Sequence, residues 1–405
     1  MANHQSAGRQ KMRVLIVGAG IAGSTLAYWL QRAGHELTLL ERSHDLRRGG
    51  YLIDFWGTGF DVAERMGLVP RLRREGYDLT EVRDVASDGH SVASLDPQRI
   101  AAGASGRYVS ILRSDLAAAI YDSLDGGVET IFGDTVTRLM EGERSVSVEF
   151  DHAAPREFDL VVGADGLHSQ VRKLAFGAES NFERDLGIAV AAFDVTGYRP
   201  RDELVAVMHA EVGFQAIRVA LRDDITMFML TFRHHGPVPV DDVSAQQELL
   251  RTSLADAGWE IPEILRQLPR ARTLYLDRAS QIRMPTWTSG RVALIGDAAA
   301  SPSLLAGQGS ALAMVEAYVL AAELAATPGD HRRAFDAYER RLTPMIASKQ
   351  DAAHGLGIVF APANRRDLLL LRSVGMKLMN IRPLAGLMLG RSLRDQAGLP
   401  TWPGR

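Results

Sequence analysis

One short segment near the start constrains the fold of this chain more than any other. Residues 13–17 form an apolar run rich in β-branched side chains, and glycines follow it directly. Residues 21–31 then place apolar side chains at helical spacing, and residues 36–41 have the pattern of a second strand. Strand, tight turn, helix and strand make a βαβ unit of about 30 residues. The chain therefore begins with a parallel sheet.

The turn in this unit fits the dinucleotide-binding fingerprint Gly-x-Gly-x-x-Gly. The first glycine permits the turn, the second lets a pyrophosphate approach the backbone, and the third lets the helix pack closely on the strand. An acidic residue at the end of the second strand is placed to accept hydrogen bonds from an adenosine ribose. The residues expected to contact a nucleotide are Gly18, Gly20, Ala22, Gly23 and Glu41. The motif does not distinguish NAD from FAD, because both carry the same ADP half.

A later motif favours FAD. Residues 291–295 predict another buried strand, which ends in Gly296-Asp297 and is followed by a helical pattern over 310–324. An aspartate at the carboxyl end of a sheet strand suits the ribityl chain and the pyrimidine edge of a flavin. The positive end of the following helix would stabilise an anion at that edge. The expected flavin-binding residues in this region are Asp297, Pro302, Gly307 and Gly309.

The middle of the chain has a different pattern. Residues 225–232 alternate between two sets of side chains, which is typical of strands with two different faces. We therefore expect a second, antiparallel domain over roughly 183–280, and two domains suit a chain of 405 residues. The last 60 residues are helical in pattern and basic.

Composition excludes several classes of protein. A net charge of -3 gives nucleic acid no electrostatic attraction, and the absence of cysteine removes disulfide, thiolate-metal and flavin disulfide reductase chemistry. The 11 histidines include no HExxH or paired-ligand spacing, so we expect no metal site. No run approaches the ~18 apolar residues of a membrane span, and the start of the chain lacks a secretory signal. We expect a cytoplasmic protein.

Three segments, in their order along the chain, resemble the FAD-dependent aromatic hydroxylases, or group A flavoprotein monooxygenases. They are residues 17–23, residues 163–172 and residues 291–297 with the alanines and proline that follow. The resemblance covers essentially the whole chain and implies a para-hydroxybenzoate hydroxylase-like fold with bound FAD. It implies that Arg113 binds FAD, and that the segment around Asp165 serves both the FAD pyrophosphate region and the passage of NADPH. Arg42 and Arg48 are either solvated charges or further FAD contacts.

Within that group the chain is similar to the tetracycline-inactivating flavin monooxygenases and to polyketide-tailoring hydroxylases, through residues 48–54, 282–291 and 307–318. Drug-inactivating, biosynthetic and catabolic enzymes would all show this pattern. Four residues depart from the group, which often has a histidine, an asparagine and a second proline in these places: Ala300, Ser310, Ala311 and Leu304. These departures put in doubt how the flavin ring and the reacting edge of the substrate are positioned.

The expected architecture is α/β: a discontinuous Rossmann-like FAD-binding domain, an antiparallel-sheet substrate domain and C-terminal helices. In the tetracycline-inactivating relatives such helices bridge the two domains beside the substrate entrance. The predicted divisions are 1–80, 101–182 and 281–330 for the FAD domain, 81–100 and 183–280 for the substrate domain, and 331–405 for the bridging helices.

The resemblance also implies a mechanism. Reduced FAD would react with oxygen to give a C4a-hydroperoxide, which hydroxylates an electron-rich carbon of an aromatic or polycyclic small molecule. The protein then positions the substrate and keeps water away from the hydroperoxide, and no side-chain acid, base or nucleophile is required. NADPH or NADH would be a transient co-substrate, because no second Gly-x-Gly-x-x-Gly occurs. The predicted substrate-binding residues are His209, Phe214, Arg218, Met227, Met229 and His234.

Other readings stay open. The chain could be a flavin oxidoreductase that does not hydroxylate, or a flavin-binding protein without catalysis. The sequence is compatible with a monomer or a homodimer. It does not name the substrate.

Overall fold

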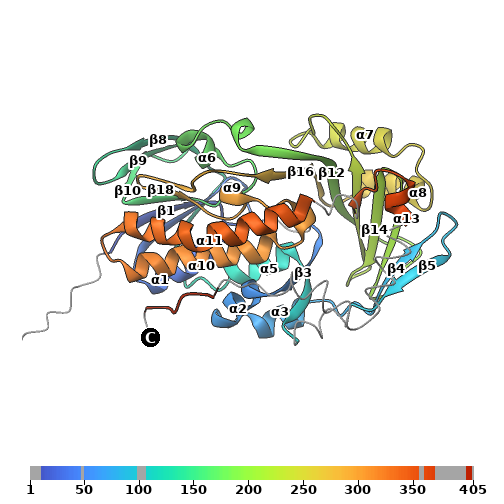
Figure 1. Ribbon diagram of the computed structural model, residues 1–405, viewed down its shortest axis with the longest axis horizontal. Coiled ribbons are helices and arrows are strands. Elements are labelled where there is room, and N and C mark those ends of the chain that lie inside the picture. The colour runs from blue at the N-terminus through green and yellow to red at the C-terminus, as the bar shows by residue number, and fades with distance from the viewer. Residues whose placement is uncertain (1–10, 47–49, 98–105, 355–359, 370–397, 404–405) are drawn as a thin grey trace, which may run out of the picture.

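The computed structural model describes residues 11–46, 50–97, 106–354, 360–369 and 398–403 (Figure 1). It confirms the predicted mixed α/β fold, in which a nucleotide-type sheet and a largely antiparallel sheet lie at opposite ends of the molecule. Two helices late in the chain, α10 (Gly309–Ala326) and α11 (His331–His354), lie along the first sheet. The predicted limits of the domains stay a prediction.

The first sheet has six strands in the order β17-β18-β11-β1-β2-β7. The pairs from β18 to β7 are parallel, and β17 pairs with β18 antiparallel. The inner strands β1 and β11 are buried because helices or other segments cover both faces, which is why their sequences are continuous apolar runs. The strands are β1 (Arg13–Val17), β2 (Glu36–Glu41), β7 (Glu129–Phe132), β11 (Leu160–Gly163), β17 (Thr288–Ser289) and β18 (Val292–Leu294).

Helices α1, α10 and α11 lie side by side along this sheet (Figure 1). By length and composition α10 is apolar enough to cross a membrane. However, 67% of this helix is buried inside the protein, as in the core helix of a globular fold. The helices around the first sheet are α1 (Ile21–Arg32), α2 (Thr58–Arg65), α3 (Val69–Glu75), α5 (Arg113–Tyr121), α6 (Gln170–Ala175), α9 (Asp297–Ala300), α10 (Gly309–Ala326) and α11 (His331–His354).

The second sheet has seven strands in the order β16-β12-β15-β14-β13-β4-β5. Its pairs are antiparallel except for β13 with β4. The strands are β4 (Glu81–Val85), β5 (Ser91–Leu95), β12 (Glu183–Thr196), β13 (Val205–Glu211), β14 (Phe214–Ala220), β15 (Ile225–Arg233) and β16 (Leu274–Ile282); the segments beside it are α7 (Val243–Ser253), α8 (Ile261–Gln267) and α13 (Arg365–Leu369).

The two faces of the second sheet have different neighbours, as the alternation in residues 225–232 predicts. Phe228 and Leu230 lie in an apolar cluster with residues of α7 and α8, whereas Met227 lies in a separate cluster with Tyr77 and Leu79. We call these the helix-covered face and the inner face. Tyr51 and Leu52, from the chain that follows the first βαβ unit, pack against the inner-face cluster. The inner face is therefore turned toward the part of the molecule with the predicted nucleotide-binding turn, which we call the cofactor side.

Two small sheets complete the fold. One pairs β3 (Leu52–Trp56) with β6 (Tyr108–Leu112), and the other joins β8 (Val136–Glu141), β9 (Val146–Phe150) and β10 (Arg156–Phe158). Short 3-10 turns lie at Glu179–Asn181, Leu268–Arg270 and Leu304–Ala306. β3 and β6 matter most for the site, because each leads into residues that lie between the two large sheets.

Candidate cofactor and substrate site

Two glycines of the first turn, Gly18 and Gly23, are required by close packing, whereas the third, Gly20, borders open space. Gly18 has φ +106, and a Cβ there would collide with the Ala164 carbonyl; a Cβ on Gly23 would collide with the Gly18 carbonyl. These two positions are fixed by the close packing of β1, α1 and β11. A Cβ on Gly20 would meet no atom within 4 Å, and the backbone there is extended, at φ -75. Room beside Gly20 is therefore left open by the protein.

The start of α1 faces this open space, and neither a capping side chain nor an acidic residue in its first turn offsets its partial positive charge. Gly20 is the N-cap, no side chain caps the helix, and the first turn holds no acidic residue. Such an end carries partial positive charge and unsatisfied N–H groups, which suit a phosphate. Glu41 borders the turn: its carboxylate accepts the Ala19 N–H at 3.0 Å and the Ser43 N–H at 3.0 Å. Its contact with a ribose stays a prediction.

A second turn, between β18 and α9, lies against the first. A Cβ on Gly296, which has φ +63, would lie 3.0 Å from the Ala22 Cβ and 3.6 Å from the Ala313 Cβ. The turn is therefore pressed between α1 and α10. Asp297 follows it as the first residue of α9, and within the described ranges no protein group hydrogen-bonds its carboxylate. The predicted residues Ala22 and Asp297 are brought to one place.

Asp297 also meets the start of α10. A Cβ on Gly309 would lie 3.8 Å from Asp297 Oδ1. The N-cap of α10 is Gln308, which makes no side-chain cap hydrogen bond, and the first turn again holds no acidic residue. Two helices thus present uncapped N-termini near the same pair of turns. This arrangement attracts an extended ligand that carries negative charge.

A buried carboxyl group holds the second turn in place. Glu316, in α10, is almost fully buried, and its Oε2 accepts the Gly296 N–H at 2.6 Å. The Tyr338 hydroxyl lies 3.5 Å from the same oxygen and donates to the Leu294 carbonyl at 3.0 Å. Burial raises the pKa of Glu316 well above its usual range, and the nearby Asp297 charge adds to this effect. No motif in the sequence marks Glu316, because its partners come from other elements.

Arg113 approaches from the other side. It begins α5, and its main-chain N–H donates to the Tyr51 carbonyl at 3.1 Å. Burial opposes the charge on the guanidinium, but attraction to Tyr51 and to the Asp297 carboxylate raises the pKa of Arg113. Within the described part of the chain its guanidinium has no hydrogen-bonded protein partner. Arg113 and Asp297 are therefore opposite charges that attract each other, while their polar atoms remain available to hydrogen-bond a ligand.

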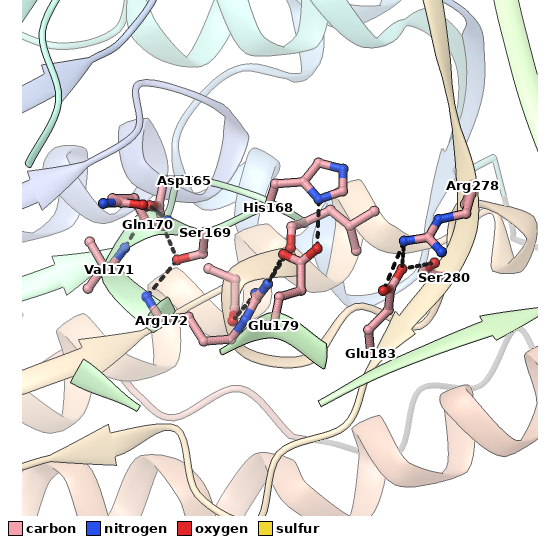
Figure 2. A network of polar contacts seen from close by, with 12 residues as sticks. Asp165, His168, Ser169, Gln170, Val171, Arg172, Glu179, Glu183, Arg278 and Ser280 are labelled. Carbon is pink, nitrogen blue, oxygen red and sulfur yellow. Dashed lines mark hydrogen bonds and ion pairs between the residues drawn. The ribbon is translucent and has the colours of Figure 1, made fainter. Parts of the chain in front are cut away.

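Asp165, by contrast, is fully occupied by its own segment (Figure 2). Its carboxylate accepts the Ser169 hydroxyl at 2.5 Å and the main-chain N–H groups of Gln170 and Val171 at 2.7 and 3.1 Å. Burial raises the pKa of Asp165, and these hydrogen bonds oppose the rise. The side chain thus satisfies the first N–H groups of α6. A direct contact between Asp165 and FAD stays a prediction.

The rest of this segment ties the two large sheets together. Arg172 is fully buried and donates to Glu179 at 2.6 Å and to the Ala298 carbonyl at 3.0 Å. His168 lies between two carboxylates, with Nδ1 2.9 Å from Glu179 and Nε2 3.0 Å from Asp277 of β16. Hydrogen bonds to Asp277 and Glu179 raise the pKa of His168 to about 10, so the ring is protonated at neutral pH. Figure 2 shows His168 and Arg172 meeting the same glutamate.

His168 and Asp277 also line a cavity of about 590 Å³ at the edge of the second sheet. Arg278 borders it and is held by Glu183 at 2.8 Å. The loop after β15 closes the other side, at His235 to Val238. The cavity combines two cationic groups and the carboxylates of Asp185 and Asp277 with an apolar wall. Within the described ranges, no group of three or more His, Asp or Glu side chains is arranged to hold a metal ion.

The structure does not bring the six predicted substrate residues together. Met227 lies in the inner-face cluster, and Met229 packs against it. His209 is buried and bonded to the Val85 carbonyl and to Glu211, each at 2.9 Å. Arg218 is buried and paired with Glu260 and Asp202, each at 2.8 Å. The residues at or beside the helix-covered face are His209, Phe214, Arg218 and His234, whose ring lies 6.2 Å from that of Phe232.

The parity of the strands explains this separation. Neighbouring strands in register share a face, so Arg218 lies beside Phe228 while Ile217 lies beside Met229. The prediction drew residues of both parities into one set. The alternation in residues 225–232 is the signal in the sequence that separates the two faces.

The other predicted residues lie as follows. Pro302 is buried, and its carbonyl accepts Gln281 Nε2 at 3.3 Å. Gly307 ends a short turn with φ +65 and open space where a Cβ would be. Arg42 is exposed, and Arg48 lies outside the described residues. Of the departures from the family pattern, Ala311 meets Gly59 so closely that a Cβ on Gly59 would lie 2.6 Å from the Ala311 Cβ.

Comparison with known proteins agrees with this geometry. The family model described as "FAD binding domain" matches residues 11–353. An uncharacterized protein of Mycobacterium tuberculosis is 35% identical over 351 residues, covering 83% of this chain and 91% of the relative. A flavin-dependent monooxygenase from an unknown prokaryotic organism is 33% identical over 340 residues, covering 84% and 87%. The crystal structure of tetracycline destructase Tet(55) matches with a TM-score of 0.84 at 28% identity, covering 97% and 99%.

Proposed function

Because the chain belongs to the FAD binding domain family of flavin-dependent monooxygenases, we propose that it uses NAD(P)H and molecular oxygen to hydroxylate an aromatic or polycyclic small molecule. The likeness to Tet(55) makes tetracyclines and related polyketides the first substrates to test. We propose that the protein works in the cytoplasm, as a monomer or a homodimer.

One observation carries the proposal. Arg113 and Asp297 lie close enough for their charges to interact, yet within the described ranges neither side chain hydrogen-bonds protein. Both side chains are partly exposed, so their polar atoms are accessible to a ligand as well as to water. The uncapped starts of α1 and α10 and the open space beside Gly20 belong to the same place. These features fit the pyrophosphate, ribityl and pyrimidine parts of FAD.

In this proposal each group has a defined role. The α1 terminus and Gly20 bind the pyrophosphate, Glu41 the ribose, and Asp297 the ribityl hydroxyls. The start of α10 favours negative charge on the pyrimidine edge of the reduced ring. When bound and reduced, FAD supplies the electrons that activate oxygen. The inner face of the second sheet, with Met227 and Met229, supplies an apolar wall that keeps water from the reaction.

We propose that the nicotinamide co-substrate docks in the cavity beside His168 and Arg278. His168 and Arg278 lie beside the Asp277 and Asp185 carboxylates in this lining, so together they offer hydrogen-bonding groups to the polar parts of the co-substrate, and the wall at Pro237 and Val238 offers apolar contact. Transient binding needs no second Rossmann unit. A His168→Gln variant should raise the KM for NADPH several-fold while the flavin content stays unchanged, and an unchanged KM would exclude this docking place.

The direct test is NADPH oxidation by the FAD-loaded enzyme, with and without a tetracycline or a simpler polycyclic phenol. Hydrogen peroxide and product mass are followed together. A substrate-stimulated rate with a product heavier by one oxygen supports the hydroxylase. Stimulation that yields peroxide alone points to a ligand that fits but does not react. If no compound stimulates the rate while the enzyme still oxidises NADPH, the non-hydroxylating oxidoreductase is the better account. Protein that takes up no FAD contradicts the proposal.

A further inference from the structure

Two tyrosines from distant parts of the chain meet between the sheets. Tyr51 directly precedes β3 on the cofactor side, and Tyr275 lies in β16 of the second sheet. Their ring centroids are 6.1 Å apart, with the planes tilted by 49°. The pair therefore spans the boundary between the cofactor side and the inner face.

Neither hydroxyl has a hydrogen-bonded protein partner within the described part of the chain. Both groups lie near Arg113 and Asp297, whose charges act on each of them. Burial raises the pKa of both tyrosines, so each hydroxyl keeps its proton at neutral pH and can donate as well as accept. Both tyrosines are partly exposed, so their hydroxyls are available to hydrogen-bond a ligand.

The surroundings of the pair are apolar. Along one row of the second sheet, Ala192 pairs with Tyr275 on one side and with Met229 on the other, so a small side chain separates these two larger ones. Tyr51 packs with Leu52 and Leu112 against the same face. A flat, apolar ring that bears one polar atom is the ligand shape that suits such walls.

We propose that the hydroxyls of Tyr51 and Tyr275 together bind the oxygen substituent of the aromatic substrate, and so select a phenolic hydroxyl over an ether. A phenol donates to one tyrosine and accepts from the other, whereas a methyl ether can only accept. The two tyrosines are specificity-determining residues. This inference rests on the proposed hydroxylase function.

The test uses FAD-loaded enzyme and two probes, 2-naphthol and its methyl ether 2-methoxynaphthalene. Dissociation constants are measured from the change in flavin absorbance for the wild type, Tyr51→Phe, Tyr275→Phe and the double variant. Each single substitution should weaken 2-naphthol about fivefold, the effect of one hydrogen bond, whereas the ether, which can only accept, should be weakened by at most one of the two substitutions. The double variant should lose the preference for the phenol. The affinity for FAD should be the same in all four proteins.

Tyr121→Phe is the matched control. The Tyr121 hydroxyl, at the end of α5, donates to the Thr130 hydroxyl at 3.1 Å, away from the pair, so neither probe should change. Equal binding of the two probes by the wild type, or binding of neither, overturns the inference. A loss of FAD affinity in the tyrosine variants also overturns it, because the hydroxyls would then serve the cofactor. A wild type that retains no flavin contradicts the proposed function itself.

Discussion

Asp165 and Asp297 occupy similar positions in the first sheet and have opposite partners. Each follows a glycine-containing turn at the carboxyl end of a parallel strand, and those strands, β11 and β18, are neighbours. The Asp165 carboxylate accepts three hydrogen bonds from its own segment, whereas Asp297 has no protein partner within the described ranges. The same local motif thus stabilises the fold in one case and is left available in the other. Only the surroundings distinguish them.

The largest expected effect tests whether the space near Asp297 belongs to a ligand. The Cβ of a Gly20→Val side chain would meet no protein atom within 4 Å, and the backbone is already extended. The thermal stability of the apo protein should stay within about 2 °C of the wild type. FAD affinity should fall more than about 100-fold, because the side chain fills the predicted place of the pyrophosphate. Flavin occupancy after gel filtration measures this.

Gly23→Ala is its control, because the added Cβ collides with the Gly18 carbonyl. That variant should lose apo stability first. If Gly20→Val keeps full flavin occupancy, the cofactor does not lie where we place it.

The second prediction contrasts the two aspartates directly. Asp297→Ala should weaken FAD binding about 10- to 100-fold, the effect of losing charged hydrogen bonds, with little change in apo stability. Asp165→Ala should do the reverse: apo stability should fall by about 2 kcal/mol, since the Gln170 and Val171 N–H groups at the start of α6 lose their acceptor, and FAD affinity should change only a few-fold. Chemical denaturation and flavin titration of both variants give the two numbers.

Asp297→Asn and Asp165→Asn keep the shape of each side chain and show how much of either effect is charge. Similar behaviour of the two alanine variants in both measurements would remove the distinction between the turns.

The third prediction concerns what holds the Asp297 turn. Glu316→Ala leaves the buried Gly296 N–H without an acceptor and should destabilise the protein by about 2 kcal/mol, with a several-fold loss of FAD affinity. Glu316→Gln keeps an acceptor of the same size and should retain both. Denaturation curves with and without FAD measure the two effects.

The pH dependence separates these variants further. Because burial raises the folded pKa of Glu316 well above the ordinary value of 4.5, the native state keeps a proton that the unfolded state releases above that pH. Wild-type stability should therefore fall relative to Glu316→Gln as the pH rises from 4.5. A constant difference between the two proteins across this range would show that the carboxyl is ionised in the fold.

The smallest expected effect concerns the network on the Asp165 side. His168→Gln should lower the melting temperature by about 2–4 °C at pH 6, because the protonated ring joins Glu179 to Asp277. The folded pKa of about 10 is above the ordinary value of 6.5, so this stabilisation is complete below pH 6.5 and is lost as the pH rises through 10. The melting difference should shrink over that window. A difference that grows with pH would contradict the assigned charge.

The sequence predicted the elements of the first βαβ unit closely, whereas the six residues predicted as one substrate set lie on both faces of the second sheet. Strand β1, helix α1 and strand β2 lie within a residue of their predicted limits, because their patterns are local and the turn between them demands glycine. The substrate residues were predicted as one set, but His209 and Arg218 point to the opposite face from Met227. Their face depends on strand register, which a list of polar and aromatic residues does not contain.

The sequence by itself determined the fold class, the family and the place where a dinucleotide is expected, because each follows from neighbouring residues. Tertiary structure alone decided which polar groups of distant segments hydrogen-bond one another and which remain available to a ligand. His209 finds its partner in Val85, which is distant along the chain, while Arg113, Asp297, Tyr51 and Tyr275 meet from separate elements. Hydrogen bonds are limited in number and short in range, so whether a side chain is satisfied depends on which distant segments the fold brings within about 3 Å.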